Sequence, residues 1–169
     1  MTGKQNNATP TPSPGSSARD FDFLQGLWKI RNRKLKTRFA NADDWYEFDA
    51  TGEMRTILHG LGNTDSFLAT PDGRPFEALT LRLFNPDTRL WSIYWADSAH
   101  GTLDPPVIGS FEDNTGMFTG SDTMNEKDIL LKFNWDKSDP SNPVWSQAFS
   151  EDNGKTWEWN WYMYFSKQS

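Results

Sequence analysis

The sequence contains no cysteine, and it also lacks long apolar runs and helical periodicity. Without cysteine the chain has no disulfides, thiol nucleophiles or Cys-ligated metal sites, so its stability has to come from a packed core. No apolar run is long enough to span a membrane, and the first nineteen residues hold no apolar segment of the secretory type. We therefore expect a cytoplasmic protein with no membrane partner.

Positive charge is also scarce. The chain carries 17 Lys and Arg against 23 Asp and Glu, which gives a formal net charge of −6. A field of that sign repels phosphate backbones and anionic lipid surfaces. The charge balance therefore argues against nucleic acid as a partner.

Aromatic residues, in contrast, are abundant. Phe, Trp and Tyr make up 15% of the 169 residues, with nine Trp and twelve Phe. Each such ring buries about 150–250 Å² when it is enclosed. Since the length corresponds to about one domain, we expect a single domain with an aromatic interior.

The chain divides by composition into a tail and a folded domain. Residues 1–19 are rich in Thr, Pro, Ser, Gly and Asn, which cannot bury enough apolar surface to offset ordering, so they are predicted to be disordered. Residues 20–169 form the predicted domain, in which period-two alternation recurs between Gly, Pro, Asn and Asp. The predicted strands span residues 27–38, 45–50, 53–58, 64–69, 76–84, 90–96, 107–112, 117–122, 129–135, 144–149 and 157–165.

Short turns connect these strands, which predicts antiparallel pairing of consecutive strands. Turn chemistry is present at residues 49–52, 85–88, 112–116 and 152–154, where Pro presets φ, Gly accepts positive φ, and Asn and Asp bond their own backbone. An up-and-down meander of about ten strands keeps two open edges unless it closes. The sequence therefore predicts an all-β fold, a single antiparallel β-barrel of about ten strands, with a short helical turn at residues 20–25 that plugs one end.

Two hairpin registers carry the predictions about the barrel interior. Pairing Leu83 with Trp91 places six apolar side chains on one face and sends Arg82 and Tyr94 to the other. That apolar set is Leu79, Leu81, Leu83, Trp91, Ile93 and Trp95. Pairing Phe149 with Trp157 collects a second set on one face: Trp145, Gln147, Phe149, Trp157, Trp159, Trp161, Met163 and Phe165.

Several phrases of the sequence carry a resemblance to a known group of proteins. The segment Gly26-Leu-Trp28 is the G-x-W signature that opens the first strand of lipocalins, and it stands ahead of an uninterrupted series of strands. The later phrases at residues 79–86, 91–98, 103–107 and 147–158 resemble bacterial lipocalin-like (calycin) proteins of a domain-of-unknown-function family. The resemblance covers nearly all of residues 20–167. It implies a calycin barrel and no established activity.

Residues 150–157 also match S-x-D-x-G-x-T-W, the Asp-box that sialidase propellers repeat on several blades. A single copy suits a hairpin loop whose Ser, Asp and Thr side chains satisfy backbone groups of the turn. We interpret this copy as a hairpin turn and not as a sign of glycosidase activity.

Candidates for catalysis are isolated in the sequence. His59 and His100 stand outside any cluster with metal-ligand spacing, and the pairs Asp43 with Asp44 and Asp97 with Asp104 are equally well explained as exposed loop acids. No serine lies in a nucleophile elbow. We therefore assign no catalytic residue, no metal ligand and no cofactor.

The polar residues Arg82 and Tyr94 admit two interpretations. If they lie inside, an Arg with a Tyr forms a site for a ligand carboxylate. Because an unpaired buried guanidinium is costly, whereas the opposing Leu and Trp face gains by burial, the sequence favours Arg82 on the outside.

The function predicted from these patterns is the binding of a small apolar or aromatic molecule inside the barrel. The predicted site residues are Trp91, Trp95, Trp145, Gln147 and Trp161, with Arg82 and Tyr94 in the case of a polar lumen, and Trp28 closes the base. A barrel filled by its own rings is an equal structural alternative, although about ten strands enclose more space than side chains readily fill. An enzyme such as a cyclase, isomerase or hydrolase, with Asp97, His59, Arg82 or Tyr94 at the mouth, is the alternative function. A solid barrel that serves as an interaction surface, as in a homodimer, is a third.

Overall fold

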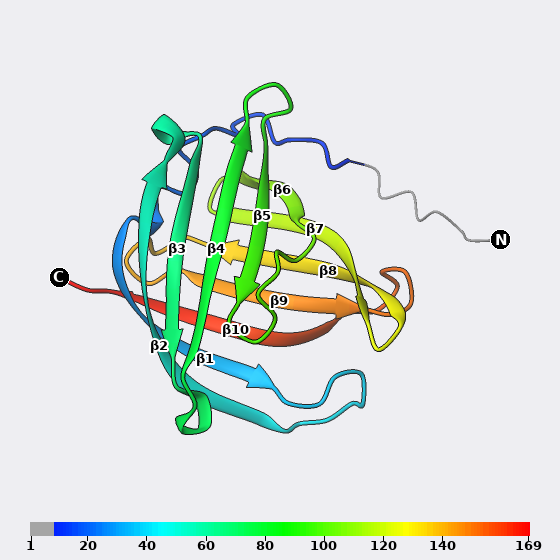
Figure 1. Ribbon diagram of the computed structural model, residues 1–169. Coiled ribbons are helices and arrows are strands. Elements are labelled where there is room, and N and C mark those ends of the chain that lie inside the picture. Colours follow the sequence, from blue (N-terminus) through cyan, green and yellow to red (C-terminus); the bar gives the residue numbers. More distant parts are fainter. Residues whose placement is uncertain (1–8) are drawn as a thin grey trace.

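The computed structural model describes residues 9–169, and these form ten antiparallel strands (Figure 1). Consecutive strands pair with each other, and β1 also pairs with β10, so the sheet closes into an up-and-down barrel without edges. The strands are β1 (Gly26–Leu35), β2 (Trp45–Ile57), β3 (Gly62–Ala69), β4 (Phe76–Asn85), β5 (Leu90–Asp97), β6 (Val107–Glu112), β7 (Thr115–Met124), β8 (Lys127–Asp136), β9 (Val144–Ser150) and β10 (Glu158–Lys167). The predicted all-β barrel is thereby confirmed.

Helical structure within residues 9–169 is limited to three 3₁₀ turns, which are η1 (Asp22–Leu24), η2 (Leu58–Gly60) and η3 (Pro71–Gly73). None of them is long and apolar enough to cross a membrane. The first turn lies within residues 20–25, as predicted. Phe21, which precedes this turn, and Leu24 within it are almost fully buried, and the Trp28 indole N–H donates to the Leu24 carbonyl oxygen at 2.6 Å. This contact anchors the plug to β1, and we call this end of the barrel the closed end.

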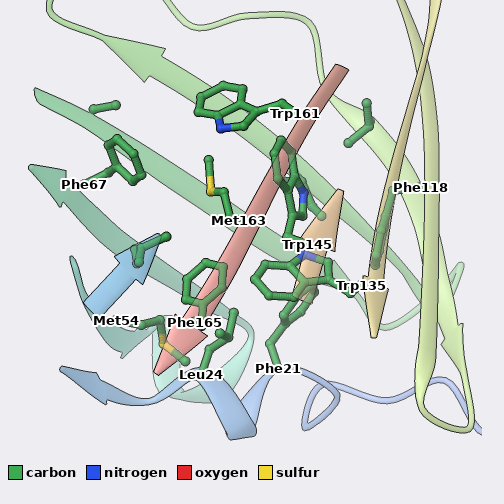
Figure 2. Packing of buried hydrophobic residues seen from close by; sticks show 14 of the residues in the cluster. Phe21, Leu24, Met54, Phe67, Phe118, Trp135, Trp145, Trp161, Met163 and Phe165 are labelled. Carbon is green, nitrogen blue, oxygen red and sulfur yellow. The ribbon is translucent and has the colours of Figure 1, made fainter. Parts of the chain in front are cut away.

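Aromatic rings fill the interior next to this plug (Figure 2). The Phe21 ring meets Trp91 and Phe111 edge to face, with ring centroids 4.9 and 5.0 Å apart. Gly116 leaves room for these rings, because a Cβ there would come within 2.9 Å of both Phe111 and Phe118. The closed end is therefore solid, which agrees for this half of the barrel with the expectation of an interior filled by rings.

The predicted break between two strands at residues 49–52 is wrong, because β2 runs without interruption from Trp45 to Ile57. Gly52 lies within the strand opposite Phe67 of β3. A Cβ on Gly52 would come 2.6 Å from the Ser66 carbonyl oxygen and 3.3 Å from the Ile30 Cδ1. The glycine thus allows a close approach inside the sheet and does not form a turn.

The β4–β5 register differs by one residue from the predicted one. Phe84, not Leu83, pairs with Trp91. The turn holds one more residue than expected, because Arg89 adopts a positive φ of 56° and donates its backbone N–H to the Asn85 carbonyl oxygen at 2.7 Å. A positive φ is uncommon at residues other than Gly, so this conformation of Arg89 could not be predicted from the sequence.

This shift exchanges the two faces of β4. Leu79 is 43% exposed on the outside, whereas Arg82, predicted to lie outside, is only 4% exposed and faces the interior. Tyr94 pairs with Leu81 on the outer face, so Arg82 and Tyr94 do not share a face. The inward side chains of this hairpin are Ala78, Thr80, Arg82, Phe84, Trp91, Ile93 and Trp95.

The β9–β10 face is confirmed in part. A bulge at Asn160 shifts the register, so that Trp159 pairs with Ala148 and Trp161 pairs with Gln147. Trp159 is 36% exposed, and Trp157 lies before β10 in the connecting loop, so the prediction that both share the inner face is wrong. The inner set that remains is Trp145, Gln147, Phe149, Trp161, Met163 and Phe165.

The loop at residues 150–157 is a side-chain-bonded hairpin turn, as predicted. The Asp152 carboxylate accepts hydrogen bonds from the Thr156 backbone N–H at 2.9 Å, the Thr156 hydroxyl at 2.6 Å and the Ser150 hydroxyl at 2.8 Å. The Gly154 N–H donates to the Ser150 hydroxyl, and the Trp157 indole N–H donates to the Gly154 carbonyl oxygen. Hydrogen bonds from Thr156 and Ser150 lower the pKa of Asp152 to about 2.

The predicted disorder of residues 1–19 does not hold for the described part of that segment. The Ser16 hydroxyl donates to the Arg89 carbonyl oxygen at 2.7 Å, and the Trp91 indole N–H donates to the Ser17 carbonyl oxygen at 3.2 Å. In Figure 1 this segment, in blue, passes the end of the barrel where the β4–β5 hairpin turns. Polar backbone and hydroxyl groups hold it, which explains why composition alone suggests a free tail. The first eight residues lie outside the described part of the chain.

Candidate functional site

A cavity of about 330 Å³ occupies the barrel interior beyond the plug. Leu24 and Trp28 contribute to its floor at the closed end, and loops at the opposite end surround its mouth. Aromatic side chains dominate the wall: Phe67, Trp95, Phe133, Trp145, Phe149 and Trp161. The barrel is therefore solid at one end and hollow at the other.

Trp161 is the ring that organises this wall. Its indole meets Trp145, Trp95 and Phe67 edge to face, with centroid separations of 5.4, 5.8 and 6.5 Å and interplanar angles of 87°, 81° and 87°. Its indole N–H donates to the Asn32 Oδ1 at 3.0 Å. Such contacts are typical of stable aromatic packing, so the rings keep their positions without a guest.

Buried amide side chains form hydrogen bonds next to this aromatic wall. The Asn32 Nδ2 donates to the Ile30 carbonyl oxygen at 3.1 Å, and the Gln147 Nε2 donates to the Asn160 Oδ1 at 2.9 Å. Both asparagines are fully buried. Gln147 lines the cavity, as predicted. Its Nε2 is already bonded within the protein, so its carbonyl oxygen is the end of the amide that a ligand donor could use.

An ion pair lies toward the closed end of the cavity. The Arg82 Nη2 lies 2.8 Å from the Asp65 Oδ2, and the Arg82 Nη1 donates to the Asn63 Oδ1 at 2.9 Å. The guanidinium also lies over the Phe21 and Trp135 rings, with centroids at 5.2 and 5.9 Å. The expectation that Arg82 lies outside assumed an unpaired guanidinium, whereas Asp65 on the neighbouring strand β3 neutralises it.

One atom of this arginine remains without a partner. Within the described residues, the buried Nε of Arg82 has no hydrogen-bond acceptor. Leaving a buried donor unmet costs about 1–3 kcal/mol. The Nε itself is enclosed by protein atoms, so this cost belongs to the burial of the ion pair.

The opposite end of the cavity carries charges of both signs. The Lys34 Nζ lies 3.8 Å from the centroid of the Trp161 ring. Burial, followed by the nearby Arg38, lowers the pKa of Lys34 to about 8. Burial also raises the pKa of Asp104, and the neighbouring Asp122 adds to this effect. The mouth of the cavity is therefore charged, whereas its interior is mostly apolar. Such an arrangement suits a ligand that has polar groups at its edges.

Asp97 and His100 form a second pair at this end. The His100 Nδ1 lies 2.9 Å from the Asp97 Oδ1, and the Trp95 indole N–H donates to the Asp97 Oδ2 at 3.1 Å. Burial opposes ionisation of Asp97, but the hydrogen bonds from Trp95 and His100 outweigh it and lower the pKa of this carboxyl. The imidazole is mostly exposed. Asp97 therefore acts mainly to fix the loop after β5 and the Trp95 ring.

The four residues named for an enzyme do not converge. Asp97 lies at the mouth, and Arg82 lies deep in the cavity. Tyr94 is on the outer face, and His59 lies in the turn η2 near the closed end, outside the cavity wall. Within residues 9–169 no three His, Asp or Glu side chains gather as metal ligands. These four residues therefore do not meet at one point.

Five of the seven predicted site residues line the cavity: Arg82, Trp95, Trp145, Gln147 and Trp161. Trp91 does not, because it belongs to the packing at the closed end, and neither does Tyr94. The sequence interpretation missed Lys34 and Asp65. Lys34 continues the inward alternation of Trp28 and Asn32, a pattern that could have revealed it.

Comparisons with known proteins give no family. No protein-family model matches the chain, and no curated protein matches it. A solved structure described as "Structure of EF1p2_mFAP2b bound to DFHBI" is similar, with a TM-score of 0.49 and 11% sequence identity. The match covers 89% of this chain and 98% of that chain.

Proposed function

We propose that the protein binds one small aromatic molecule in the barrel cavity. The observation that carries this proposal is the hollow of about 330 Å³ walled by rings that hold one another in place. Apolar cavities of about 150 Å³ take up benzene, so this volume suits a molecule of roughly two fused or linked rings. A preformed site of this kind needs little ordering on binding, which favours affinity.

The wall also favours flat rings over flexible chains. Indole and phenyl edges surround the space on several sides, and offset or edge-to-face contacts with a flat ligand add to the gain from apolar burial. Gln147 supplies a polar contact that fixes the orientation of a ligand in a mostly apolar pocket.

Titration calorimetry with a panel of mono-, bi- and tricyclic aromatic compounds and linear fatty acids tests the proposal. We expect bicyclic compounds to bind most tightly, with quenching of tryptophan emission and a rise in Tm. Failure of the whole panel to bind or to raise Tm contradicts the proposal.

A matched pair of variants on one strand locates the binding. Ile93 lines the cavity, whereas the adjacent Ser92 faces outward. Ile93→Trp fills part of the cavity and should weaken binding of a bicyclic compound by tenfold or more. Ser92→Trp adds an indole outside and should change the affinity by less than twofold. Equal effects of the two substitutions would place the ligand elsewhere.

The finer classification is part of the same proposal. We propose a lipocalin-like protein of the calycin group, in which the Trp28 side chain of the G-x-W segment closes the base of the barrel. A cytoplasmic location is likewise proposed, and fractionation of the host cell with an antibody tests it.

A further inference from the structure

Within residues 9–169, Lys34 of β1 is the only lysine that lines the cavity. Its Nζ lies 3.8 Å from the centroid of the Trp161 ring and has no hydrogen-bond acceptor in this part of the chain. Two side-chain atoms there are both fully buried and without a partner, the Arg82 Nε and the Glu158 Oε1. The Lys34 Nζ is not one of them, so it keeps surface that a molecule in the cavity can reach.

The surroundings of this amine favour its uncharged form. Burial is the largest cause of the lowered pKa of Lys34, the charge of Arg38 adds to it, and Asp97 has a smaller effect in the opposite direction. A pKa of about 8 leaves about one amine in ten uncharged at pH 7, against about one in three thousand for a lysine at 10.5. A lysine amine that is desolvated and next to another cation is activated as a nucleophile toward carbonyl carbon.

Acids at the mouth argue against an anionic partner for the amine. Burial raises the pKa of Asp104, and the charges of Asp122 and Asp97 raise it further, so these three carboxylates lie near one another. A ligand carboxylate at the mouth would meet these like charges. The Arg38 Nη1 already donates to the Asn160 carbonyl oxygen at 3.1 Å. An uncharged carbonyl group meets no such repulsion.

The aromatic wall would hold an aldehyde beside the amine. The amine lies over Trp161, which meets Trp145 and Phe67 edge to face (Figure 2). A flat ring bound among these side chains brings its substituent next to the Nζ, so that addition becomes effectively unimolecular. The iminium product keeps a positive charge over the indole face, and its burial limits hydrolysis by water.

We propose that the Lys34 Nζ forms an imine with an aromatic aldehyde held in the cavity, which makes Lys34 a covalent attachment site for the ligand. The uncharged amine adds to the carbonyl carbon, a proton moves from nitrogen to oxygen, and loss of one water leaves the C=N bond. No oxidant or reductant takes part. The inference rests on the proposed binding of an aromatic molecule in the cavity, and it names the class of ligand.

Reductive trapping tests the inference on the full chain. The protein is incubated at pH 7 with 2-naphthaldehyde and sodium cyanoborohydride, which reduces the iminium to a stable secondary amine, and peptide mapping by mass spectrometry gives the labelling rate at each lysine. Two lysines outside the cavity wall serve as internal controls. Lys132 lies over the Trp157 ring, and burial lowers the pKa of Lys137, whose Nζ donates to the Asp20 carbonyl oxygen at 3.0 Å. Lys34 should be labelled at least tenfold faster than either control, and equal rates overturn the inference.

A compound without a carbonyl group separates the inference from the proposed function. 2-Naphthol has the same ring system, so saturation of the cavity with it should slow the labelling of Lys34 by tenfold or more and leave Lys132 unchanged. If calorimetry shows that 2-naphthol binds but it does not slow the labelling of Lys34, the inference is overturned and the proposed function stands. If neither naphthalene compound binds, the proposed function fails, and the inference fails with it.

Two variants assign the fast labelling to one amine. Lys34→Arg keeps a cation next to Trp161 but has no amine that forms a stable imine, so the fast labelling should disappear. Lys132→Met removes a lysine that contacts an indole outside the cavity wall, so the fast labelling should persist. Fast labelling that survives in Lys34→Arg overturns the inference, and the mapping of the wild-type chain decides the question if that variant does not fold.

Discussion

Replacement of Lys34 by Met should stabilise the protein at neutral pH. The Lys34 ammonium is largely buried against the Trp161 indole, and within residues 9–169 no carboxylate lies within 4.0 Å of it. Burial is the largest cause of its lowered pKa, and the positive charge of Arg38 contributes, while Asp97 acts weakly in the opposite direction. The folded protein therefore holds this proton less firmly than the unfolded chain does.

The size of the effect follows from the two pKa values. A pKa of about 8 in the folded state against 10.5 in the unfolded chain, at about 1.4 kcal/mol per pH unit, corresponds to a penalty of about 3 kcal/mol at pH 7. The contact with Trp161 offsets about 1–2 kcal/mol of this penalty, because a cation over an indole face is favourable. The expected gain of Lys34→Met is therefore about 1–2 kcal/mol, or about 2–8 °C in Tm for a chain of this size.

The gain should depend on pH with a definite sign. Between pH 8 and 10.5 the folded protein binds fewer protons at Lys34 than the unfolded chain, so the stability of the wild type rises with pH across that window. At pH 10 most of the penalty is gone, and the advantage of the Met variant should fall below about 1 kcal/mol.

Urea unfolding at pH 7 and pH 10 measures both effects. Lys132→Met is the matched control, since its Nζ lies 3.9 Å from the Trp157 ring, outside the cavity wall. That substitution loses a contact of the same kind without relieving deep burial, so it should be neutral or slightly destabilising at both pH values. A loss of stability in Lys34→Met at pH 7, or a gain that is the same at both pH values, would refute the reasoning.

Three further predictions concern the fold. Gly109→Ala should prevent native folding, because a Cβ there would lie 1.9 Å from the Met117 carbonyl oxygen, whereas Gly15→Ala, with no atom within 4 Å, should leave the circular dichroism spectrum unchanged. Asp152→Asn should remove an acid-dependent loss of stability that the wild type shows as pH falls from about 4 toward 2, since this carboxyl has a pKa of about 2 against 3.8 in the unfolded chain. Deletion of residues 9–17 should lower Tm measurably because that segment is hydrogen-bonded to the barrel, and an unchanged Tm would contradict this.

The strand pattern was readable from the sequence because it depends on local chemistry. Period-two alternation and the turn residues located every strand, and the Asn85 side chain does bond the Asp87 and Thr88 backbone N–H groups in its turn. Gly52 was wrongly predicted to be a turn residue. Its lack of a Cβ allows a close approach to another strand, and contacts between strands cannot be recognised in a sequence.

The cavity wall was predicted only where the register was simple. The β9 residues Trp145 and Gln147 were placed correctly, but the bulge at Asn160 breaks the period-two alternation of β10 between Trp159 and Trp161, and the positive φ of Arg89 moves the β4–β5 pairing by one residue. A shift of one residue sends every following side chain to the other face. Loop geometry of this kind depends on the whole barrel, which explains why Trp159 and Arg82 were assigned to the wrong sides.

The burial of Arg82 shows how a closed barrel changes the cost of a charge. An isolated guanidinium among rings would be excluded, and the acid within β4, Glu77, is exposed on the outer face and cannot pair with it. The antiparallel pairing of β3 with β4 brings Asp65 opposite Thr80, two residues from Arg82, so the carboxylate reaches the guanidinium across the sheet. The barrel thus holds a balanced ion pair among aromatic rings, where neither charge could be buried alone.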